Sequence, residues 1–188
     1  MEWIIIMLYG FSMFIICLFS LAQLNLTWHY IRKVDDPALN YVPTNLPFVT
    51  LQLPLYNEKY VIDRLLDAVT SLDYPNTHLE IQILDDSDDE TVGMIDARID
   101  QIKNKGIDIV HLRRQNRIGF KAGALQHGLT TAKGEFIAVF DADFIPKIDF
   151  LKQVIPHFKD EKIAMVQTRW GHLNENFNLL TKMQAFGL

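Results

Sequence analysis

The chain has 188 residues, of which 49% are hydrophobic, and its formal net charge is −5. This length suits one globular domain with an appendage, and the negative charge without a block of Lys or Arg argues against a nucleic-acid-binding protein. The single cysteine, Cys17, excludes a disulfide or a cysteine-based metal site within the chain. The six histidines lack metal-ligand spacing on one helix face, so a zinc site is not expected.

The N-terminal segment is long and apolar enough to cross a membrane. Residues 3–24 form a run of 22 residues without a formal charge, and a helix of that length reaches about 33 Å across a hydrocarbon layer of roughly 30 Å. Trp3 at one end and Trp28 with Tyr30 at the other are typical of membrane interfaces. A cleaved signal peptide with a small-x-small site at residues 20–22 is the alternative. However, the segment has no positive n-region and is longer than an ordinary h-region.

The charges that flank the apolar run predict its orientation. Arg32 and Lys33 follow it, whereas only Glu2 precedes it, and cytoplasmic flanks of membrane spans carry the excess of Lys and Arg. We therefore expect residues 1–32 to form a transmembrane anchor in the membrane, with the remainder of the chain in the cytoplasm.

A linker and an α/β domain are predicted to follow. Residues 33–46 and the adjoining Pro47 contain three prolines, a composition typical of a linker. Within residues 47–188, short runs of apolar and β-forming residues predict strands at 48–53, 79–84, 107–112, 136–140 and 163–167. Apolar residues at helical spacing predict helices between them, over residues 61–72, 92–102, 122–132 and 151–158.

This alternation predicts a mostly parallel sheet with flanking helices, joined by right-handed crossovers. Ser87 and Glu90 have the spacing of a capping box at the start of the second of these helices. Because ligands of such sheets bind beyond the carboxyl ends of the strands, we expect the binding and catalytic residues at these ends.

Two motifs follow the first two strands. The first, Leu-Pro-Leu-Tyr-Asn-Glu, places Tyr56 where its ring either stacks on a nucleobase or simply packs against the sheet. The second places five carboxylates after the second strand. Three of them suit the first turn of the next helix, where the dipole favours negative charge: Asp88, Asp89 and Glu90. Asp85 and Asp86 lie at the strand tip instead, where a carboxylate can accept a hydrogen bond from a base N–H or a ribose hydroxyl.

The third motif opens the third predicted helix with the sequence Arg-Ile-Gly-Phe-Lys-Ala-Gly-Ala-Leu, residues 117–125. Free backbone N–H groups at a helix start attract phosphate, and Arg117 and Lys121 add positive charge. The motif lacks the spacing of a Walker loop, and an exposed basic helix start is the alternative.

The fourth motif, Asp-Ala-Asp, follows the fourth strand. Asp141 and Asp143 would repel each other at the end of an apolar strand, and a divalent metal bound to a diphosphate would offset this repulsion. Oxygen ligands suit Mg²⁺ or Mn²⁺. Haloacid-dehalogenase-type phosphatases also use Asp-x-Asp, but after their first strand. A fifth motif, residues 167–174, follows the last predicted strand and is readily explained as an Arg stacked on a Trp.

These five segments, in this order, resemble glycosyltransferase family 2 with its GT-A (Rossmann-like) fold, over about residues 47–188. The stretch at 117–125 and the Val-Gln-x-Arg-Trp stretch resemble the cellulose-synthase-like and glucomannan-synthase-like branch. The resemblance implies that Tyr56 stacks on the base, that Asp86 binds it with Glu58 close by, and that Lys121 lies near the diphosphate. It further implies a metal at the Asp-x-Asp pair, with Asp143 as the direct ligand.

Two features depart from the family's pattern. Its acceptor base is an aspartate in a later Thr/Glu-Asp motif, and no such motif follows Asp143. The segment Gln-Thr-Arg-Trp at 167–170 is one residue shorter than the Gln-x-x-Arg-Trp of processive members and comes too early. Because the sequence stops in what reads as a helix, we expect a C-terminally truncated domain without its catalytic base, inactive by itself.

The expected function is that of an inverting hexosyltransferase. It would use a UDP- or GDP-sugar as donor and a glycan or lipid-linked acceptor, in the synthesis of a β-linked polysaccharide. Two alternatives remain. One is a membrane-tethered nucleotide-sugar-binding protein without catalysis. The other is a nucleotidyltransferase, which would ordinarily carry a Gly-rich phosphate loop after its first strand.

Overall fold

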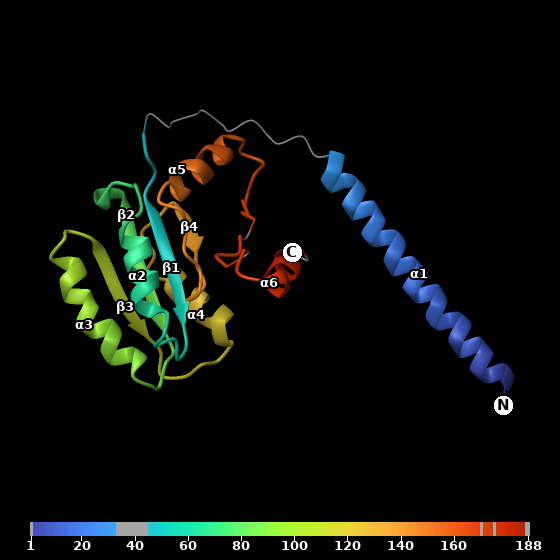
Figure 1. Ribbon diagram of the computed structural model, residues 1–188. Helices are drawn as coiled ribbons and strands as arrows, with labels where there is room; N and C mark the ends of the chain where they lie inside the picture. The colour runs from blue at the N-terminus through green and yellow to red at the C-terminus, as the bar shows by residue number, and fades with distance from the viewer. Residues whose placement is uncertain (1, 33–44, 170, 175, 187–188) are drawn as a thin grey trace. The chain divides into compact units, whose positions relative to one another are not determined.

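The computed structural model describes residues 2–32, 45–169, 171–174 and 176–186 (Figure 1). The chain divides into two compact units, Met1–Ala38 and Leu39–Leu188, and each is considered by itself. Most of the predicted linker at 33–46 lies outside the described residues.

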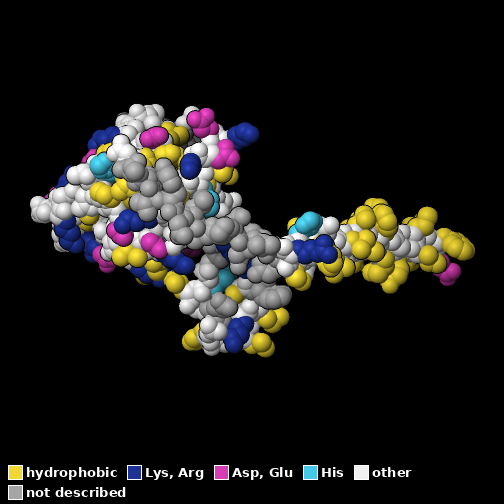
Figure 2. All heavy atoms as spheres, turned by 90° about the horizontal axis from the view of Figure 1, so that it is seen from above, with side chains coloured by type: hydrophobic (Ala, Val, Ile, Leu, Met, Phe, Trp, Pro, Cys, Tyr) yellow, Lys and Arg dark blue, Asp and Glu magenta, His cyan; other side chains and the backbone are white. Residues whose placement is uncertain are grey.

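The first unit is the helix α1, Glu2–Arg32. Its part Glu2–His29 contains an 18-residue window with a mean hydropathy of 2.5 and is the one helix, among the residues that the structure describes, that is long and apolar enough to cross a membrane. Hydrophobic side chains cover it along its length (Figure 2). The hydroxyls of Ser12, Ser20 and Thr27 each donate to the carbonyl oxygen four residues earlier at 2.9 Å, so these polar groups are satisfied without water.

The second unit is built on a four-stranded parallel sheet in the order β3-β2-β1-β4 (Figure 1). Its strands are β1 Val49–Leu55, β2 Leu79–Asp85, β3 Asp108–Arg113 and β4 Phe136–Val139. Leu55 pairs with Asp85, and Asp85 pairs with Arg113. The first three strands therefore end side by side, as the alternation of elements predicted.

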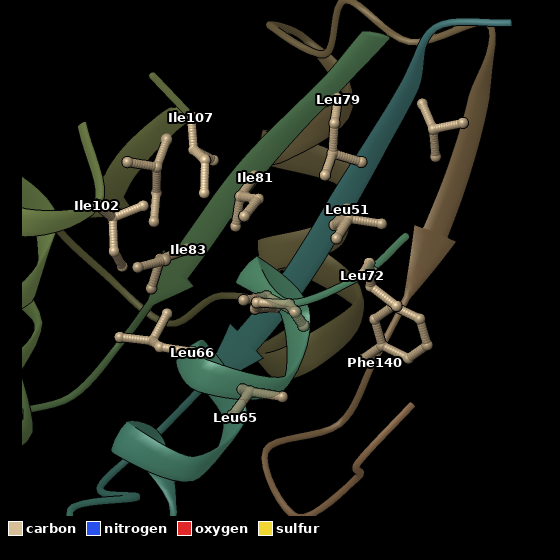
Figure 3. Packing of buried hydrophobic residues seen from close by; sticks show 14 of the residues in the cluster. Leu51, Leu65, Leu66, Leu72, Leu79, Ile81, Ile83, Ile102, Ile107 and Phe140 are labelled. Carbon is tan, nitrogen blue, oxygen red and sulfur yellow. The ribbon is translucent and has the colours of Figure 1, made fainter. Parts of the chain in front are cut away.

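The two faces of the sheet differ in chemistry. Alternate residues of β1 and β2 form a buried apolar cluster with α2 (Ile62–Thr70) and α3 (Thr91–Lys103). The cluster joins strand residues such as Leu51 and Ile81 with Leu65 and Leu66 of α2 (Figure 3). On the other face, Gln52 Nε2 donates to Gln82 Oε1 at 3.0 Å, and the Thr50 hydroxyl donates to Glu80 at 2.7 Å.

Helix α4, Phe120–Leu129, packs against this polar face of β1 and β2. The apolar stripe predicted over 122–132 is wrong as a core face, because Leu129 is exposed and the buried residues are Ala124 and Gly128. A Cβ at Gly128 would lie 2.6 Å from Gln52 Nε2. Small residues therefore face the sheet here because the helix backbone lies directly on the glutamine side chains.

The remaining helices are short. Residues 151–158 were predicted as one helix, but α5 spans only Phe150–Val154 and a 3₁₀ turn, Ile155–Lys159, continues it. Pro156 explains the change, since it cannot donate the backbone hydrogen bond of a helix interior. A 3₁₀ turn, Asn76–His78, precedes β2, and α6 spans Leu179–Phe186, with Asn178 Oδ1 accepting from Thr181 N at 2.9 Å.

Two local predictions are wrong. The strand expected at 163–167 does not form, and Met165 in it is 77% exposed. A strand needs a neighbour for its backbone groups, and no described strand pairs with this segment. The capping box also fails. Helix α3 begins at Thr91, so the three acidic residues before it lie outside its first turn, and the N-cap residue Glu90 makes no side-chain cap.

Candidate functional site

A pocket of about 360 Å³ lies at the carboxyl ends of the strands, within the range of small-molecule sites. All seven residues that the sequence nominated line it: Tyr56, Glu58, Asp86, Arg117, Lys121, Asp141 and Asp143. Pro54, Leu55, Ala124 and Ala142 complete the wall. The structure thus brings together side chains that are as much as 87 positions apart in the sequence, from Tyr56 to Asp143.

The tip of β1 is tied to the tip of β2 by Asn57. Its backbone N–H donates to Ser87 Oγ at 2.9 Å, and its side-chain amide exchanges hydrogen bonds with Asp88 at 2.8 and 3.1 Å. Asn57 has a φ of +57°, a left-handed conformation that Asn adopts more readily than most residues. Ser87 lies three residues before the N-cap residue Glu90 and does not cap α3, and its contact with Asn57 helps to fix the chain beside Tyr56.

The two aspartates at the tip of β2 face different surroundings. Asp85 is buried, accepts from Ser87 N at 2.8 Å, and lies 2.9 Å from His111 Nε2 and 3.4 Å from Arg113 Nε. Burial alone would raise the pKa of Asp85, but hydrogen bonds from His111 and Ser87 outweigh it and lower that pKa below its ordinary value. Asp85 does not line the pocket, whereas Asp86 does.

Asp86 is held by an arginine that sequence reasoning missed. Arg114 Nε donates to Asp86 Oδ1 at 3.0 Å, and Arg114 Nη2 donates to Asp86 Oδ2. The hydrogen bond and the charge of Asp86 raise the pKa of Arg114 above its ordinary value. The available signal was the pair of arginines at the end of β3, Arg113 and Arg114, since the tip of β3 neighbours that of β2.

Arg117 covers the tyrosine of the pocket. Its guanidinium carbon lies 3.2 Å from the ring centroid of Tyr56 and 5.5 Å from that of Phe120, which is a cation–π arrangement. Its Nε lies 3.9 Å from Asp86 Oδ2, too far for a hydrogen bond, and is buried without a partner in the structure. A cation with unused hydrogen-bonding capacity therefore stands beside an aromatic ring and a carboxylate.

The start of α4 brings a second cation into the pocket. Gly119 precedes the helix with a φ of +74°, which favours glycine. A Cβ at Gly123 would lie 2.1 Å from the carbonyl oxygen of Ile118, so the turn closes only around a glycine. The Lys121 ammonium, one residue into the helix, forms an ion pair with the Asp141 carboxylate.

Asp141 and Asp143 follow β4 in the chain. Directly after the strand, Phe140 N donates a hydrogen bond to Gln52 O at 3.1 Å, so the chain continues alongside β1. Both aspartates line the pocket. No group of three or more His, Cys, Asp or Glu among the described residues is arranged to hold a metal by itself. A pair of carboxylates fits Mg²⁺ or Mn²⁺, since such ions are often bound through one or two carboxylates together with substrate phosphates and water.

None of the described residues of the segment at 167–174 lines the pocket. Residues 163–169 have no regular structure. The predicted stacking of Arg169 on Trp170 involves a residue outside the described part of the chain.

Comparison with known proteins agrees with the geometry. A family model described as Glycosyl transferase family 2 matches residues 50–186. The chain is 40% identical over 165 residues to a probable glucomannan 4-beta-mannosyltransferase 3 of Arabidopsis thaliana. That alignment covers 85% of this chain and 30% of the relative, so the chain spans about a third of the relative's length.

Among solved structures, the mannosyltransferase PcManGT from Pyrobaculum calidifontis, in complex with GDP-Man and Mn²⁺, matches with a TM-score of 0.65 and 28% identity. The match covers 77% of this chain and 43% of that protein. S. aureus TarS 1-349 in complex with UDP matches with a TM-score of 0.53 and 18% identity, over 66% of this chain and 38% of that protein. The second match shows likeness of fold alone.

Proposed function

Because the chain belongs to glycosyl transferase family 2, we propose that its pocket binds a GDP-sugar. We further propose that it forms the donor-binding part of an inverting hexosyltransferase, which transfers mannose to a growing β-linked polysaccharide. A glycan or a lipid-linked sugar is the proposed acceptor.

The observation that carries this proposal is the convergence of seven side chains on one pocket at the ends of β1, β2 and β4 and at the start of α4. They form two groups. An aromatic ring, a carboxylate and a guanidinium meet where Arg117 contacts Tyr56 and approaches Asp86. An ammonium meets a carboxylate where Lys121 contacts Asp141. A nucleoside diphosphate has a base, which the first group suits, and charged phosphates, which the second group suits.

We assign the first group to the nucleoside and the second to the diphosphate. Tyr56 stacks on the base and Asp86 accepts its N–H, with Glu58 in the same wall. Lys121 offers positive charge to the phosphates, and Arg117 adds its charge from the nucleoside side. Asp141 and Asp143 hold Mg²⁺ or Mn²⁺, which, when bound, offsets charge on the departing nucleoside diphosphate.

The choice of GDP over UDP rests on the relatives. The solved structure that is 28% identical to this chain contains GDP-Man, and the Arabidopsis relative is named a mannosyltransferase. The position of Arg32 at the C-terminal end of α1 supports a pocket in the cytoplasm, where nucleotide sugars are made.

The test uses the full chain in detergent and measures GDP-mannose binding by calorimetry with and without Mn²⁺. We expect binding to require Mn²⁺ and to weaken about tenfold or more in Asp143→Asn, because a neutral amide replaces a charged ligand of the metal, and the loss of even an outer-shell partner of a metal site typically costs about 10- to 100-fold. Asp149→Asn is the control, because Asp149 lies before α5 and accepts from Gln153 Nε2 at 2.5 Å, away from the pocket wall. Equal affinities in the two variants would refute the metal assignment, and no binding to either GDP-mannose or GDP would refute the function.

A further inference from the structure

Arg114 bonds to two parts of the site at once. Its side chain is 12% exposed and that of its partner Asp86 is 5% exposed. Toward β2 it donates to both oxygens of the Asp86 carboxylate, from Nε at 3.0 Å and from Nη2. Toward α4 it donates to the carbonyl oxygens of Ile118 at 2.9 Å and Phe120 at 3.0 Å. Four of the five N–H groups of a guanidinium are therefore committed.

Glycine at position 123 makes this arrangement possible. A Cβ there would lie 2.7 Å from Arg114 Nη1, so a larger residue would push the guanidinium out of place. Arg114 thereby fixes the carboxylate at the tip of β2 to the turn from which Lys121 extends.

The contact of Arg114 with both oxygens of Asp86 limits the hydrogen bonds that this carboxylate can still accept. A guanidinium fork that meets both oxygens uses the lone pairs that point between them, and the outer lone pairs diverge. Asp86 can therefore accept a further N–H from the pocket through an outer lone pair. Both oxygens of Asp86 accept from Arg114, so Asp86 is presented to the pocket as a hydrogen-bond acceptor.

We propose that Arg114 is a positioning residue that sets the nucleobase selectivity of the pocket. By holding Asp86 as a fixed acceptor, it favours bases with a ring N–H on the pairing edge, guanine and uracil. It disfavours adenine and cytosine, whose ring nitrogen at the corresponding position is an acceptor. This role deepens the proposed function and rests on it.

Loss of Arg114 has a defined consequence for its neighbours. Arg117 Nε lies 3.9 Å from Asp86 Oδ2 and has no hydrogen-bond partner. Without Arg114, Arg117 is the nearest cation to the released carboxylate, and a contact between them covers the acceptor that the base needs. The selectivity for the nucleobase then falls. The contact of Lys121 with Asp141 involves neither Arg114 nor Asp86 and is expected to remain.

The test compares GDP with ADP, which have the same ring size and opposite hydrogen-bonding edges. The full chain in detergent with Mn²⁺ is titrated with GDP, ADP and pyrophosphate by calorimetry. We expect the wild-type chain to bind GDP about 10- to 100-fold more tightly than ADP, the discrimination typical of base-edge hydrogen bonds. In Arg114→Met this ratio should fall below about threefold, and Arg114→Lys should restore only part of it, since lysine cannot reproduce the fork.

Two controls separate positioning from a loss of folding. Arg98→Met removes an arginine that contacts two other carboxylates, Asp63 and Asp67, on helix α2, and should leave the GDP-to-ADP ratio unchanged. Pyrophosphate affinity should stay within about twofold in all variants. In an Asp86→Asn background, Arg114→Met should have little further effect, because the two residues act through one another.

The outcomes separate this role from the proposed function. Absence of GDP binding by the wild-type chain would reject both. An unchanged GDP-to-ADP ratio in Arg114→Met, or effects of Arg114→Met and Asp86→Asn that simply add, would reject the role of Arg114 alone. A parallel loss of pyrophosphate binding in Arg114→Met would show that Arg114 supports folding of the α4 turn and would also overturn the inference.

Discussion

Replacement of Lys121 by methionine is expected to change metal binding and nucleotide binding in opposite directions. In the structure the Lys121 ammonium pairs with Asp141, a proposed metal ligand. The ammonium and a divalent cation therefore compete for one carboxylate. Methionine keeps most of the side-chain volume and removes the charge, so the competitor disappears while the wall of the pocket is retained.

The magnitude follows from the exposure of the ion pair. The side chain of Lys121 is 53% exposed and that of Asp141 is 39% exposed, and such solvent-screened pairs contribute about 0.2–1 kcal/mol. Removing the pair should thus raise Mn²⁺ affinity in the absence of nucleotide by about 1.4- to 5-fold. In the presence of saturating Mn²⁺, GDP affinity should fall about tenfold, because the diphosphate loses a charged hydrogen-bond donor.

Electron paramagnetic resonance of free Mn²⁺ measures the first effect on the full chain in detergent, and calorimetry with GDP measures the second. Lys152→Met is the matched control, since Lys152 pairs with Asp73 at 2.7 Å at a comparable exposure of 45% and 58%, and neither residue lines the pocket. Weaker or unchanged Mn²⁺ binding in Lys121→Met would refute the competition between ammonium and metal.

Two further predictions concern stability. Gly123→Ala should destabilise the domain by about 1–3 kcal/mol in urea unfolding, because its Cβ would lie 2.1 Å from the Ile118 carbonyl oxygen. Gly93→Ala, in α3 with nothing within 4 Å, should instead stabilise it by about 0.5–1 kcal/mol, and equal effects would contradict the packing argument. Burial alone would lower the pKa of His111, but hydrogen bonds to Asp85 and a second aspartate raise it above its ordinary value. The contribution of His111 to stability is therefore complete below about pH 6.5 and lost as pH rises through the raised pKa. In His111→Asn the urea midpoint should decrease less with rising pH above about pH 6.5 than in the wild-type chain. An unchanged decrease would show that another group causes it.

The strands and the pocket residues could be predicted because both follow from short-range rules. Four apolar runs mark the strands, and the carboxyl ends of parallel strands meet at one edge. Tyr56, Asp86 and Asp143 therefore converge whatever the details of the loops between them. The roles of these residues in donor and metal binding remain proposals.

Features that depend on contacts between distant segments could not be read from the sequence. The capping box was wrong because α3 begins only at Thr91, and Ser87 bonds instead to Asn57, which is 30 positions away. The stripe on α4 was wrong because that helix lies on a polar sheet face, where Gly128 fits and leucine does not. The support from Arg114 depends on a turn whose shape no periodic pattern encodes.

The buried polar pairs between β1 and β2, Gln52 with Gln82 and Thr50 with Glu80, also determine the register of the two strands. A slip of one residue would turn the apolar side chains to the wrong face, so hydrophobicity alone prevents it. A slip of two residues would keep every side chain on its proper face, and hydrophobicity cannot detect it. Such a slip would break the pairing of Gln52 with Gln82 and of Thr50 with Glu80, all buried, and leave some of these polar groups unsatisfied, at a cost of about 1–3 kcal/mol for each. It would also move Asp86 by about 6.6 Å relative to Tyr56. The polar side chains in the middle of the sheet thus fix the register of β1 and β2, and with it the relative positions of pocket residues that they do not contact.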